Sequence, residues 1–310
     1  MTDERFFVTG ALGCVGAWTV RELVREGTPV VAFDLGTNTR RLEQILAPDE
    51  IGRITFVTGD ITDLSALERV LDDQRITNVI HLAALQVPFS RADPPLGAAV
   101  NVVGTVNVFE AVRRLGLRDA PLVYASSMGM FIPTDVDPVS GRLEEDAVAH
   151  PGNHYGVYKL ANEGTGRVYW QDDGVASIGL RPFSVYGPGR DQGITAGPTL
   201  AIDAAVRGEP YRIAFGGRTQ LHYAPDVAKA FVQAARSPAD GAHAFSLGGP
   251  PTAIADFVAA VEAEIPGAEI TFDEAPLPFP DELPAPWFDA QLTPLEQGIR
   301  ETAEVLRSVI

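Results

Sequence analysis

Two hydrophobic periods alternate along the first 250 residues of the chain. Short runs that are apolar on both faces predict the strands of a covered sheet, at residues 6–9, 30–34, 54–58, 79–83, 122–126, 177–181 and 244–247. Amphipathic stretches typical of helices follow the first, third and fourth runs, at residues 15–26, 64–73 and 100–115. Because parallel strands need crossover connections, this alternation predicts an α/β fold with a doubly wound parallel sheet of the Rossmann type.

The regular alternation ends after Arg181. Gly187-Pro188-Gly189 opens an irregular segment, and residues 266–294 are rich in proline, which disfavours sheet strands. A last helical pattern covers residues 295–309. We therefore expect a larger domain made of residues 1–182 and about 219–249, and a smaller, discontinuous C-terminal lobe made of residues about 183–218 and 250–310.

Composition and charge exclude several classes of partner. The chain has 310 residues, 45% of them hydrophobic, which is enough to bury a core. Its net charge of −17, with no basic run, argues against nucleic acid and anionic membranes as partners. The lone cysteine, Cys14, can form no intrachain disulfide. The sequence shows neither a signal peptide nor an apolar stretch long enough to span a bilayer, so we expect a soluble cytoplasmic protein.

A glycine-rich motif, Thr9-Gly10-Ala11-Leu12-Gly13-Cys14-Val15-Gly16, lies between the first predicted strand and the first predicted helix. In this context the first glycine allows a tight turn, the second lets the backbone approach a pyrophosphate, and the third lets the helix pack on the sheet. The free N–H groups of the helix start also favour phosphate. The predicted dinucleotide contacts in this motif are Gly10, Leu12, Gly13, Cys14, Val15 and Gly16.

An acidic residue, Asp34, ends the second predicted strand. A carboxylate there hydrogen-bonds the adenosine ribose hydroxyls and repels a 2′-phosphate, which favours NAD over NADP. Arg40 and Arg41 follow closely and keep NADP open as an alternative, although a solvated helix start also explains them.

The ends of the third and fourth predicted strands add further candidate contacts with the cofactor. Asp60 could meet the adenine amino group or cap the next helix, and His81 is interpreted as structural. The small side chains after His81 would let the backbone lie against the cofactor. The predicted contacts here are Asp60, Ile61, Leu82, Ala83 and Ala84.

Tyr155 and Lys159 are four residues apart, so on a helix they share one face. An ammonium beside a phenol lowers the phenol pKa, so that Tyr155 can take a proton from a substrate hydroxyl while a hydride leaves. Only Lys159 and Lys229 are lysines among 24 basic residues, which argues against a chance pair. Ser126 and Ser127 end the fifth predicted strand; only one can face inward, and Ser127 is the predicted catalytic hydroxyl.

These motifs, in this order, resemble the extended short-chain dehydrogenases/reductases, in particular the NAD-dependent epimerase/dehydratase family typified by UDP-glucose 4-epimerase. The resemblance covers residues 6–226 and includes Asn101 with Gly104-Thr105. It implies an NAD-dependent enzyme without a metal and with Ser127, Tyr155 and Lys159 as catalytic residues. It also implies a homodimer built from the helices around residues 101–115 and 155–170. The further cofactor contacts that it implies are Asn101, Tyr155, Lys159, Pro182, Phe183 and Val185.

Departures from the family pattern bear on the substrate. Met128-Gly129 stands where the dehydratases of the family have Asp-Glu, which argues against dehydration. Ser184 replaces an asparagine, and Thr219 an arginine, of many sugar-nucleotide enzymes. Fewer pyrophosphate donors indicate a smaller substrate. Candidate substrate contacts, chosen by their position in loops, are Gln86, Ser90, Ser127, Arg190, Thr195 and Arg218.

The predicted function is NAD-dependent removal of a hydride from a secondary hydroxyl of a carbohydrate-like substrate, such as a sugar, a sugar acid or a polyol derivative. The first alternative is a sugar-nucleotide epimerase that retains its NAD. The second is a non-catalytic NAD sensor, which the presence of all three catalytic residues disfavours.

Overall fold

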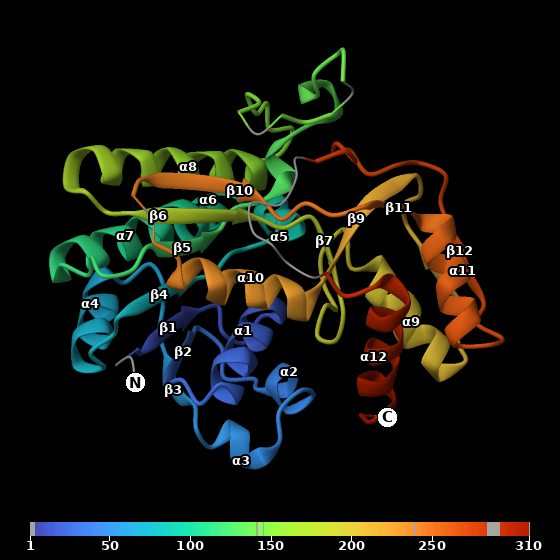
Figure 1. Cartoon of the computed structure of the whole chain (residues 1–310), viewed down its shortest axis with the longest axis horizontal. Coiled ribbons are helices and arrows are strands. Elements are labelled where there is room, and N and C mark those ends of the chain that lie inside the picture. The colour runs from blue at the N-terminus through green and yellow to red at the C-terminus, as the bar shows by residue number, and fades with distance from the viewer. Residues whose placement is uncertain (1–3, 141, 145, 239, 284–291, 310) are drawn as a thin grey trace.

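The central sheet is seen in a computed structural model that describes residues 4–140, 142–144, 146–238, 240–283 and 292–309. Seven parallel strands lie in the order β10-β6-β5-β4-β1-β2-β3 (Figure 1). The predicted doubly wound sheet is therefore confirmed, with strand ends shifted by no more than two residues. The strands are β1 (Phe6–Thr9), β2 (Val30–Asp34), β3 (Thr55–Thr58), β4 (Asn78–His81), β5 (Leu122–Ala125), β6 (Ser177–Arg181) and β10 (Ala242–Ser246).

The strand order reverses between β1 and β4. The chain builds β2 and β3 on one side of β1, then crosses to β4 and continues outward to β10. Thr9 and His81 are paired at the carboxyl ends of the two central strands. In open α/β sheets the connections diverge at such a point and leave a crevice for a ligand.

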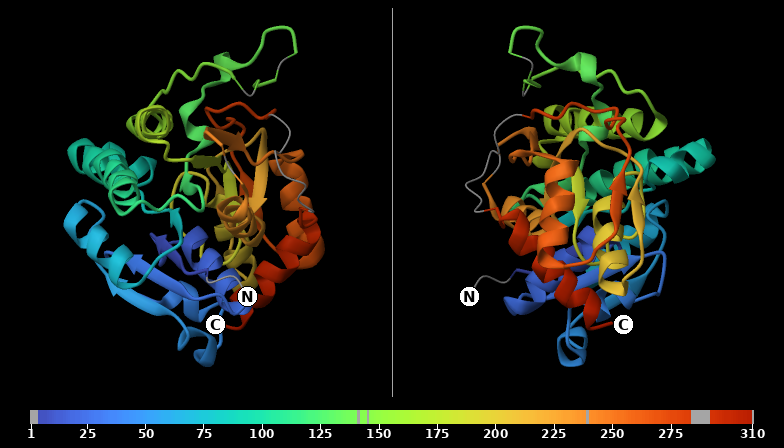
Figure 2. Two further views of the ribbon diagram at one scale, coloured as in Figure 1. Left: turned by 60° about the vertical axis from the view of Figure 1, so that its left-hand side comes forward. Right: turned by 90° about the vertical axis from the view of Figure 1, so that its right-hand side faces the viewer.

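Helices cover both faces of the sheet (Figure 2). On one face α1 (Cys14–Arg25) packs against α10 (Ala224–Arg236), and on the other lie α4 (Leu64–Asp73), α7 (Gly104–Leu115) and α8 (His154–Asp173). The apolar stripes of these helices meet two-sided apolar strands, which makes two cores. The chain enters the second face through α5 (Val87–Ala92), α6 (Pro94–Ala98) and a π-helical turn η1 (Ala99–Val103).

The later segments form a smaller lobe beside the sheet (Figure 1). Its core is apolar and includes Tyr186, Phe257 and Ile299. One three-stranded sheet has the order β11-β9-β7, and β12 pairs with β8 in a second sheet. The lobe contains β7 (Ser184–Tyr186), α9 (Gly197–Arg207), β8 (Tyr211–Ile213), β9 (Arg218–Tyr223), β11 (Pro251–Ala253), α11 (Ile254–Glu264), β12 (Ile270–Phe272) and α12 (Leu295–Arg307).

Two details of the lobe differ from the sequence-based expectations. Strand β9 belongs to the small sheet, so the chain returns to the larger unit at Ala224, where α10 begins, and not at residue 219. A three-residue strand, β12, lies within the proline-rich region, where its pairing with β8 outweighs the local sequence signal. Residues 284–291 of that region, which include Pro284 and Pro286, lie outside the described residues.

Short helices complete the connections between these elements. They are α2 (Arg40–Glu43), α3 (Pro48–Ile51) and the 3-10 turns η2 (Met128–Met130) and η3 (Pro133–Asp135). The first of them, α2, lies after β2 and beside α1, and its Arg41 donates to the Leu12 carbonyl of the glycine-rich motif.

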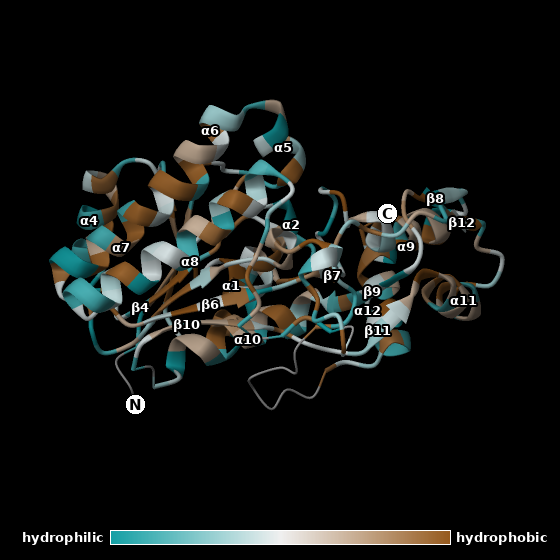
Figure 3. Ribbon diagram, turned by 90° about the horizontal axis from the view of Figure 1, so that it is seen from above, coloured by the Kyte–Doolittle hydropathy of each residue, from teal (hydrophilic) through white to brown (hydrophobic). Residues whose placement is uncertain are grey.

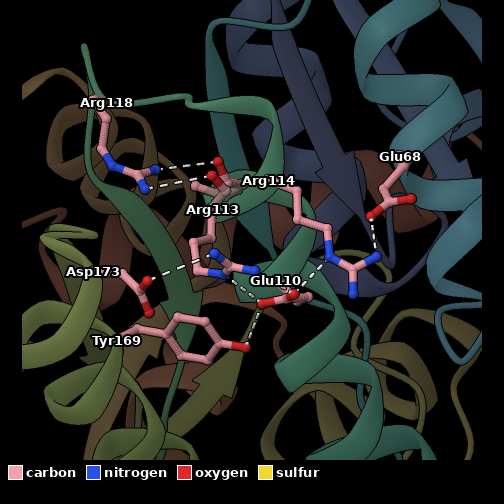
Figure 4. Close-up of polar contacts among 8 residues, drawn as sticks. Glu68, Glu110, Arg113, Arg114, Arg118, Tyr169 and Asp173 are labelled. Atoms are coloured by element: carbon pink, nitrogen blue, oxygen red, sulfur yellow. Dashed lines mark hydrogen bonds and ion pairs between the residues drawn. The ribbon is translucent and has the colours of Figure 1, made fainter.

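A polar network ties α7 to its neighbours (Figure 4). The Glu110 carboxylate accepts hydrogen bonds from Arg113 and Arg114 of its own helix and from the Tyr169 hydroxyl of α8. Arg114 also pairs with Glu68 of α4 at 3.0 Å. Such exposed pairs contribute little individually, but together they fix the orientation of α8 beside α7.

One helical stretch of the described chain, Pro94–Leu115, is long and apolar enough to cross a membrane by length and composition alone. The stretch contains Asn101, Asn107, Glu110, Arg113 and Arg114, so it is not an uninterrupted apolar run of the kind that the sequence lacks. The inner side of the stretch packs on the sheet through Val108, Phe109 and Val112. A core helix of a globular protein passes the same test.

Candidate active site

A cavity of about 610 Å³ opens at the carboxyl edge of the sheet, where the strand order reverses. Its walls come from the glycine-rich loop, the ends of β2 to β5, the start of α8 and the lobe segment after β7. The predicted cofactor residues that line it are Gly10, Leu12, Gly13, Cys14, Val15, Gly16, Asp34, Asp60, Ile61, Leu82, Ala83, Ala84, Tyr155, Lys159, Pro182, Phe183 and Val185.

The glycine-rich loop is shaped for the close approach of a phosphate group. Gly10 has a φ of +65°, and a Cβ there would lie 2.6 Å from the Ala83 backbone nitrogen. A Cβ on Gly16 would lie 2.1 Å from the Gly10 carbonyl oxygen, so only glycine lets α1 pack this tightly. No side chain caps the N-terminus of α1 at Gly13, which leaves its N–H groups for a ligand.

Two acids, Asp34 and Asp60, line the cavity together with Tyr155. Asp34 accepts hydrogen bonds from the Leu12 and Gly36 backbone nitrogens, both at 3.0 Å, so its carboxylate is held in the cavity wall. Asp60 accepts from the backbone and the hydroxyl of Thr62 and also lines the cavity. The carboxylate wall fits ribose hydroxyls and disfavours a 2′-phosphate.

His81 is structural, in agreement with its interpretation from the sequence. Its ring nitrogens lie 2.7 Å from the Thr9 hydroxyl and 3.0 Å from the Thr105 hydroxyl. Burial, helped by the nearby Lys159 charge, lowers the pKa of His81 to about 3. The ring therefore stays neutral and joins β1, β4 and α7 below the cavity floor.

A segment of the smaller lobe crosses the glycine-rich loop, and residues 187–195 are called the strap below. The Trp18 indole donates to the carbonyl of Pro188 at 2.9 Å. Arg41 donates to the carbonyls of Gly189 at 3.0 Å and of Leu12 at 2.9 Å, and so joins the strap to the loop.

Asp191 of the strap forms ion pairs with Arg40 and with Arg41. Both guanidinium groups are therefore bound to the strap. The alternative in which they receive a 2′-phosphate loses support, because the cavity presents Asp34 at this end and Arg41 is already paired. Arg190, Ile194 and Thr195 of the strap also line the cavity.

The start of α8 places the proton-transfer pair. The Asn153 side chain caps the helix by accepting from the Gly156 backbone at 3.0 Å. Tyr155 and Lys159 then face the cavity from successive turns, as their spacing predicts. The Lys159 ammonium is buried, donates to the Ala125 carbonyl at 2.6 Å and lies 5.4 Å from the centre of the Tyr155 ring. Burial lowers the pKa of Lys159 to about 8.

The two serines after β5 point in opposite directions. Ser127 lines the cavity, accepts from the Gly129 backbone at 3.0 Å and hydrogen-bonds Tyr155. Ser126 is buried and donates to Glu163 at 2.6 Å. The alternation of side chains along a strand therefore places Ser127, the predicted residue, beside the tyrosine hydroxyl.

The pKa of Tyr155 differs from the sequence-based expectation. Burial raises it, while the hydrogen bond from Ser127 and the charge of Arg190 lower it. Lys159 does not bring the pKa below its ordinary value in this geometry, because the ammonium lies over the ring face and donates to a backbone carbonyl. The base therefore needs further positive charge beside it to work near neutral pH.

Three of the remaining candidate substrate contacts line the cavity near Tyr155, namely Gln86, Arg190 and Thr195. Arg190 donates to the Thr195 hydroxyl at 3.1 Å. With its amide oriented so that both ends are satisfied, Gln86 accepts from Arg190 at 3.1 Å and donates to the strap carbonyl of Gln192 at 3.3 Å.

Three predicted contacts do not line the cavity and are corrected here. Asn101 is buried and brackets the Leu85 backbone, accepting from its nitrogen at 2.8 Å and donating to its oxygen at 2.9 Å. Ser90 is buried behind the same loop and donates to the Leu85 carbonyl. Arg218 is half exposed and lies 3.6 Å from Glu282 in an ion pair. The first two shape the wall of the cavity rather than face a ligand.

The departures from the family pattern have a structural counterpart. The hydroxyls of Ser184 and Thr219 lie 2.8 Å apart, and both residues are fully buried. They bond each other and do not face the cavity. Met128 is also fully buried, so its side chain is packing.

Sequence reasoning missed several residues of the wall, among them Leu85, Ile194 and Phe279. Phe279 packs edge to face on Phe183, with ring centres 5.7 Å apart. No local signal marks it, because it reaches the cavity through the fold of the smaller lobe. The position of Arg41 soon after Asp34 marks it as a candidate in the sequence. Its ion-pair partner, Asp191, has no such sequence signal.

Comparison with known proteins identifies the family. The sequence model of the NAD dependent epimerase/dehydratase family matches residues 6–248. The chain belongs to this family. The UDP-glucose 4-epimerase of Mycolicibacterium smegmatis is 33% identical over 248 residues, which are 79% of this chain and 77% of that enzyme.

Solved structures agree over the whole length. The Thermus thermophilus UDP-glucose 4-epimerase in complex with NAD has a TM-score of 0.80 and 27% identity, covering 99% of this chain and 100% of that one. The L-threonine dehydrogenase of Clostridium difficile has a TM-score of 0.86, at 21% identity, covering 99% and 98%. At that identity the second likeness concerns the fold alone.

The chain is thus an NAD-dependent enzyme of the short-chain dehydrogenase type. The cavity fits the cofactor: a Cβ would fill the space above Gly10, and Asp34 and the uncapped start of α1 offer ribose and phosphate contacts. When bound, NAD supplies the acceptor for a hydride.

Proposed function

We propose that the enzyme oxidises a secondary hydroxyl of a carbohydrate-like substrate, a sugar, a sugar acid or a polyol derivative, with NAD as the hydride acceptor. The observation that carries this proposal is the placement of Ser127, Tyr155 and Lys159 together at one end of the dinucleotide cavity. All three catalytic groups reach that end, and the non-catalytic sensor therefore has no structural feature in its favour.

The roles of these side chains follow from their geometry. Ser127 and Tyr155 offer two neighbouring hydroxyls that can hold the substrate oxygen. Tyr155 takes the hydroxyl proton as the carbon loses its hydride to NAD, which leaves a carbonyl. The positive charge of Arg190, joined by that of oxidised nicotinamide when NAD is bound, stabilises the phenolate form of Tyr155, while the Lys159 ammonium lies over the tyrosine ring.

The substrate side of the cavity supports a small, acidic substrate. Ser184 and Thr219 bond each other and offer nothing to a nucleotide pyrophosphate. Arg190 lines the cavity near Tyr155, and among the described residues it forms no ion pair with a carboxylate. The neighbouring acid, Asp191, pairs instead with Arg40 and Arg41. A guanidinium in that position suits a carboxylate. Within the proposed class we therefore favour a sugar acid.

A sugar-nucleotide epimerase with retained NAD is the second candidate. The strap favours it, because residues 187–195 lie across the glycine-rich loop and would slow cofactor exchange. The likeness to UDP-glucose 4-epimerases also favours it. Oxidation and return of the hydride would use the same three catalytic side chains.

One set of assays separates the two candidates. Purified protein is first tested for bound NAD by its absorbance and by release on denaturation. It is then incubated with free NAD and a panel of sugars, sugar acids and polyols, and in parallel with UDP-glucose. NADH formation with a panel member supports the dehydrogenase. Interconversion of UDP-glucose and UDP-galactose without net NADH would reject it in favour of the epimerase.

We also propose that the enzyme is a homodimer. Leu96, Val103, Val157 and Val168 are apolar and about half exposed on the outer side of α6, η1 and α8. Figure 3 shows apolar residues on these helices. A second copy that packs the same helices together would cover them, which also accounts for the apolar stretch 94–115 without a membrane.

A further inference from the structure

The chain passes between the large sheet and the smaller lobe at three places that the structure describes. The first link joins β6 to β7 through Pro182 and Phe183, the second joins β9 to α10 at residues 222–224, and the third joins β10 to β11 through residues 247–250. These links help to set the position of the lobe beside the sheet. They also affect the cavity, because its walls come from both units.

One buried histidine, His222, takes part in all three links. It is the last but one residue of β9, the central strand of the small sheet, and so belongs to the second link (Figure 1). Its Nδ1 accepts a hydrogen bond from the Phe183 backbone nitrogen of the first link at 3.1 Å. Its Nε2 donates to the Gly248 carbonyl of the third link at 2.8 Å. A single imidazole therefore joins the three segments.

The two partners fix the form of the His222 ring. A backbone nitrogen can only donate and a carbonyl oxygen can only accept, so Nδ1 carries no proton and Nε2 carries one. The residue is 5% exposed, and burial lowers the pKa of His222 to about 4. The neutral form that both hydrogen bonds require is therefore the one present near neutral pH.

The bond to Phe183 meets a need of the backbone at the first link. Phe183 lies after the end of β6 and before the start of β7, so neither strand ladder includes its N–H group. A buried N–H group without a partner costs about as much free energy as a lost hydrogen bond. Pro182 and Phe183 both line the cavity, as Tyr155 does. The His222 ring thus holds a part of the cavity wall.

The same link leads into the strap. Strand β7 follows Phe183 directly and ends at Tyr186, where the strap begins, and Val185 of β7 is paired with His222 of β9. The strap is thus attached to the larger unit in two ways. One is its set of contacts with Trp18 and the arginines of α2, and the other is the link that His222 holds.

We propose that His222 is a positioning residue, whose two hydrogen bonds hold the lobe beside the sheet, keep the strap against the glycine-rich loop and so slow the release of the cofactor. The proposal concerns the binding of NAD and not the substrate. It therefore goes beyond the proposed function, and its test needs no turnover, so that the two can fail separately.

Three variants separate the two hydrogen bonds. Asparagine has its polar atoms near the place of Nδ1, so His222→Asn can still accept from Phe183. Glutamine reaches the place of Nε2, so His222→Gln can still donate to Gly248. His222→Phe keeps a ring and loses both bonds. Thr219→Val is the matched control, because it removes a buried side-chain hydrogen bond of the same strand, to Ser184, within the small sheet.

The first readout is hydrogen exchange of the Phe183 amide, followed by NMR in protein labelled with ¹⁵N-phenylalanine. The rate is taken relative to that of the Phe109 amide in the core of the larger unit, which corrects for a general loss of stability. We expect this ratio to rise by about 2- to 10-fold in His222→Gln and His222→Phe. It should stay near the wild-type value in His222→Asn and Thr219→Val.

The second readout is the rate of NADH release in stopped flow. We expect the release to be roughly 3-fold or more faster in His222→Phe, by smaller factors in His222→Asn and His222→Gln, and unchanged in Thr219→Val. Asparagine that restores the protection of the Phe183 amide, where glutamine does not, identifies the bond to Nδ1. A merely structural role would not produce that difference.

Two results would overturn the proposal. In the first, His222→Phe exposes the Phe183 amide to exchange but releases NADH at the wild-type rate. In the second, Thr219→Val accelerates the release as much as His222→Phe, which would mean that any lost hydrogen bond of the lobe has this effect. If His222→Phe does not fold, the asparagine and glutamine variants decide. Both must then release NADH faster than wild type and must differ at the Phe183 amide.

Discussion

Opening the strap should release the cofactor faster. Asp191 pairs with Arg40, which is 59% exposed, and with Arg41, which is 23% exposed, while Asp191 itself is 29% exposed. Exposed pairs contribute roughly 0–1 kcal/mol each, and the less exposed Arg41 pair belongs near the upper end. Asp191→Asn thus removes about 1–2 kcal/mol of the free energy that holds the strap in place. This corresponds to roughly 5- to 30-fold faster dissociation of NAD.

The assay is stopped-flow release of NADH, followed by its fluorescence after mixing with excess NAD. Asp203→Asn is the matched control, because Asp203 pairs with Arg207 on the surface of α9 and does not touch the strap. We expect the control to release NADH at the wild-type rate. If Asp191→Asn and the control release it equally, the strap does not hold the cofactor in place and the structural argument for retained NAD is refuted.

Further predictions concern the cofactor, the dimer and Lys159. Asp34→Asn should bring the dissociation constants of NAD and NADP closer together in binding titrations. An unchanged ratio of the two constants would show that Asp34 does not select the cofactor. Val157→Asp should give monomers by light scattering, whereas Val139→Asp, on a loop, should not. Burial lowers the Lys159 pKa from 10.5 to about 8, so the unfolded chain binds more protons in that window. The free energy of unfolding of the wild type, measured relative to that of Lys159→Met by urea titration, should therefore rise from pH 8 to 10. A difference between the two proteins that stays constant over this range would contradict the prediction.

The sheet and the cofactor half of the cavity could be predicted because their signals are local. A strand buried on both faces is a continuous apolar run, and the motif from Gly10 to Gly16 records two close backbone contacts that only glycine permits. Tyr155 and Lys159 are likewise fixed by helical spacing alone. Each of these features needs no knowledge of a distant segment.

Contacts between distant segments account for the errors. Arg41 is 150 residues from Asp191, and nothing near either residue predicts that they pair. Asn101 matches the family pattern in the sequence. In the structure its amide forms hydrogen bonds with the Leu85 backbone and does not line the cavity. Arg218 lies on a strand whose sheet the hydrophobic pattern could not assign, so its exposure could not be foreseen.

The pKa of Tyr155 shows a different limit. The sequence places an ammonium one turn away, but it does not say how deeply the phenol is buried or where the ammonium points. In the structure burial dominates, and the charge that counters it comes from Arg190 of the strap. A helical spacing predicts the pair, whereas its electrostatics depend on the whole cavity.

The central claim is that Tyr155 takes the proton while NAD takes the hydride. The most direct measurement compares wild type and Tyr155→Phe for NADH formation at 340 nm with the same substrate, alongside NAD affinity by calorimetry. We expect turnover to fall by about 10²- to 10⁴-fold in Tyr155→Phe, with NAD affinity nearly unchanged. Turnover within a few-fold of wild type in the phenylalanine variant would contradict it.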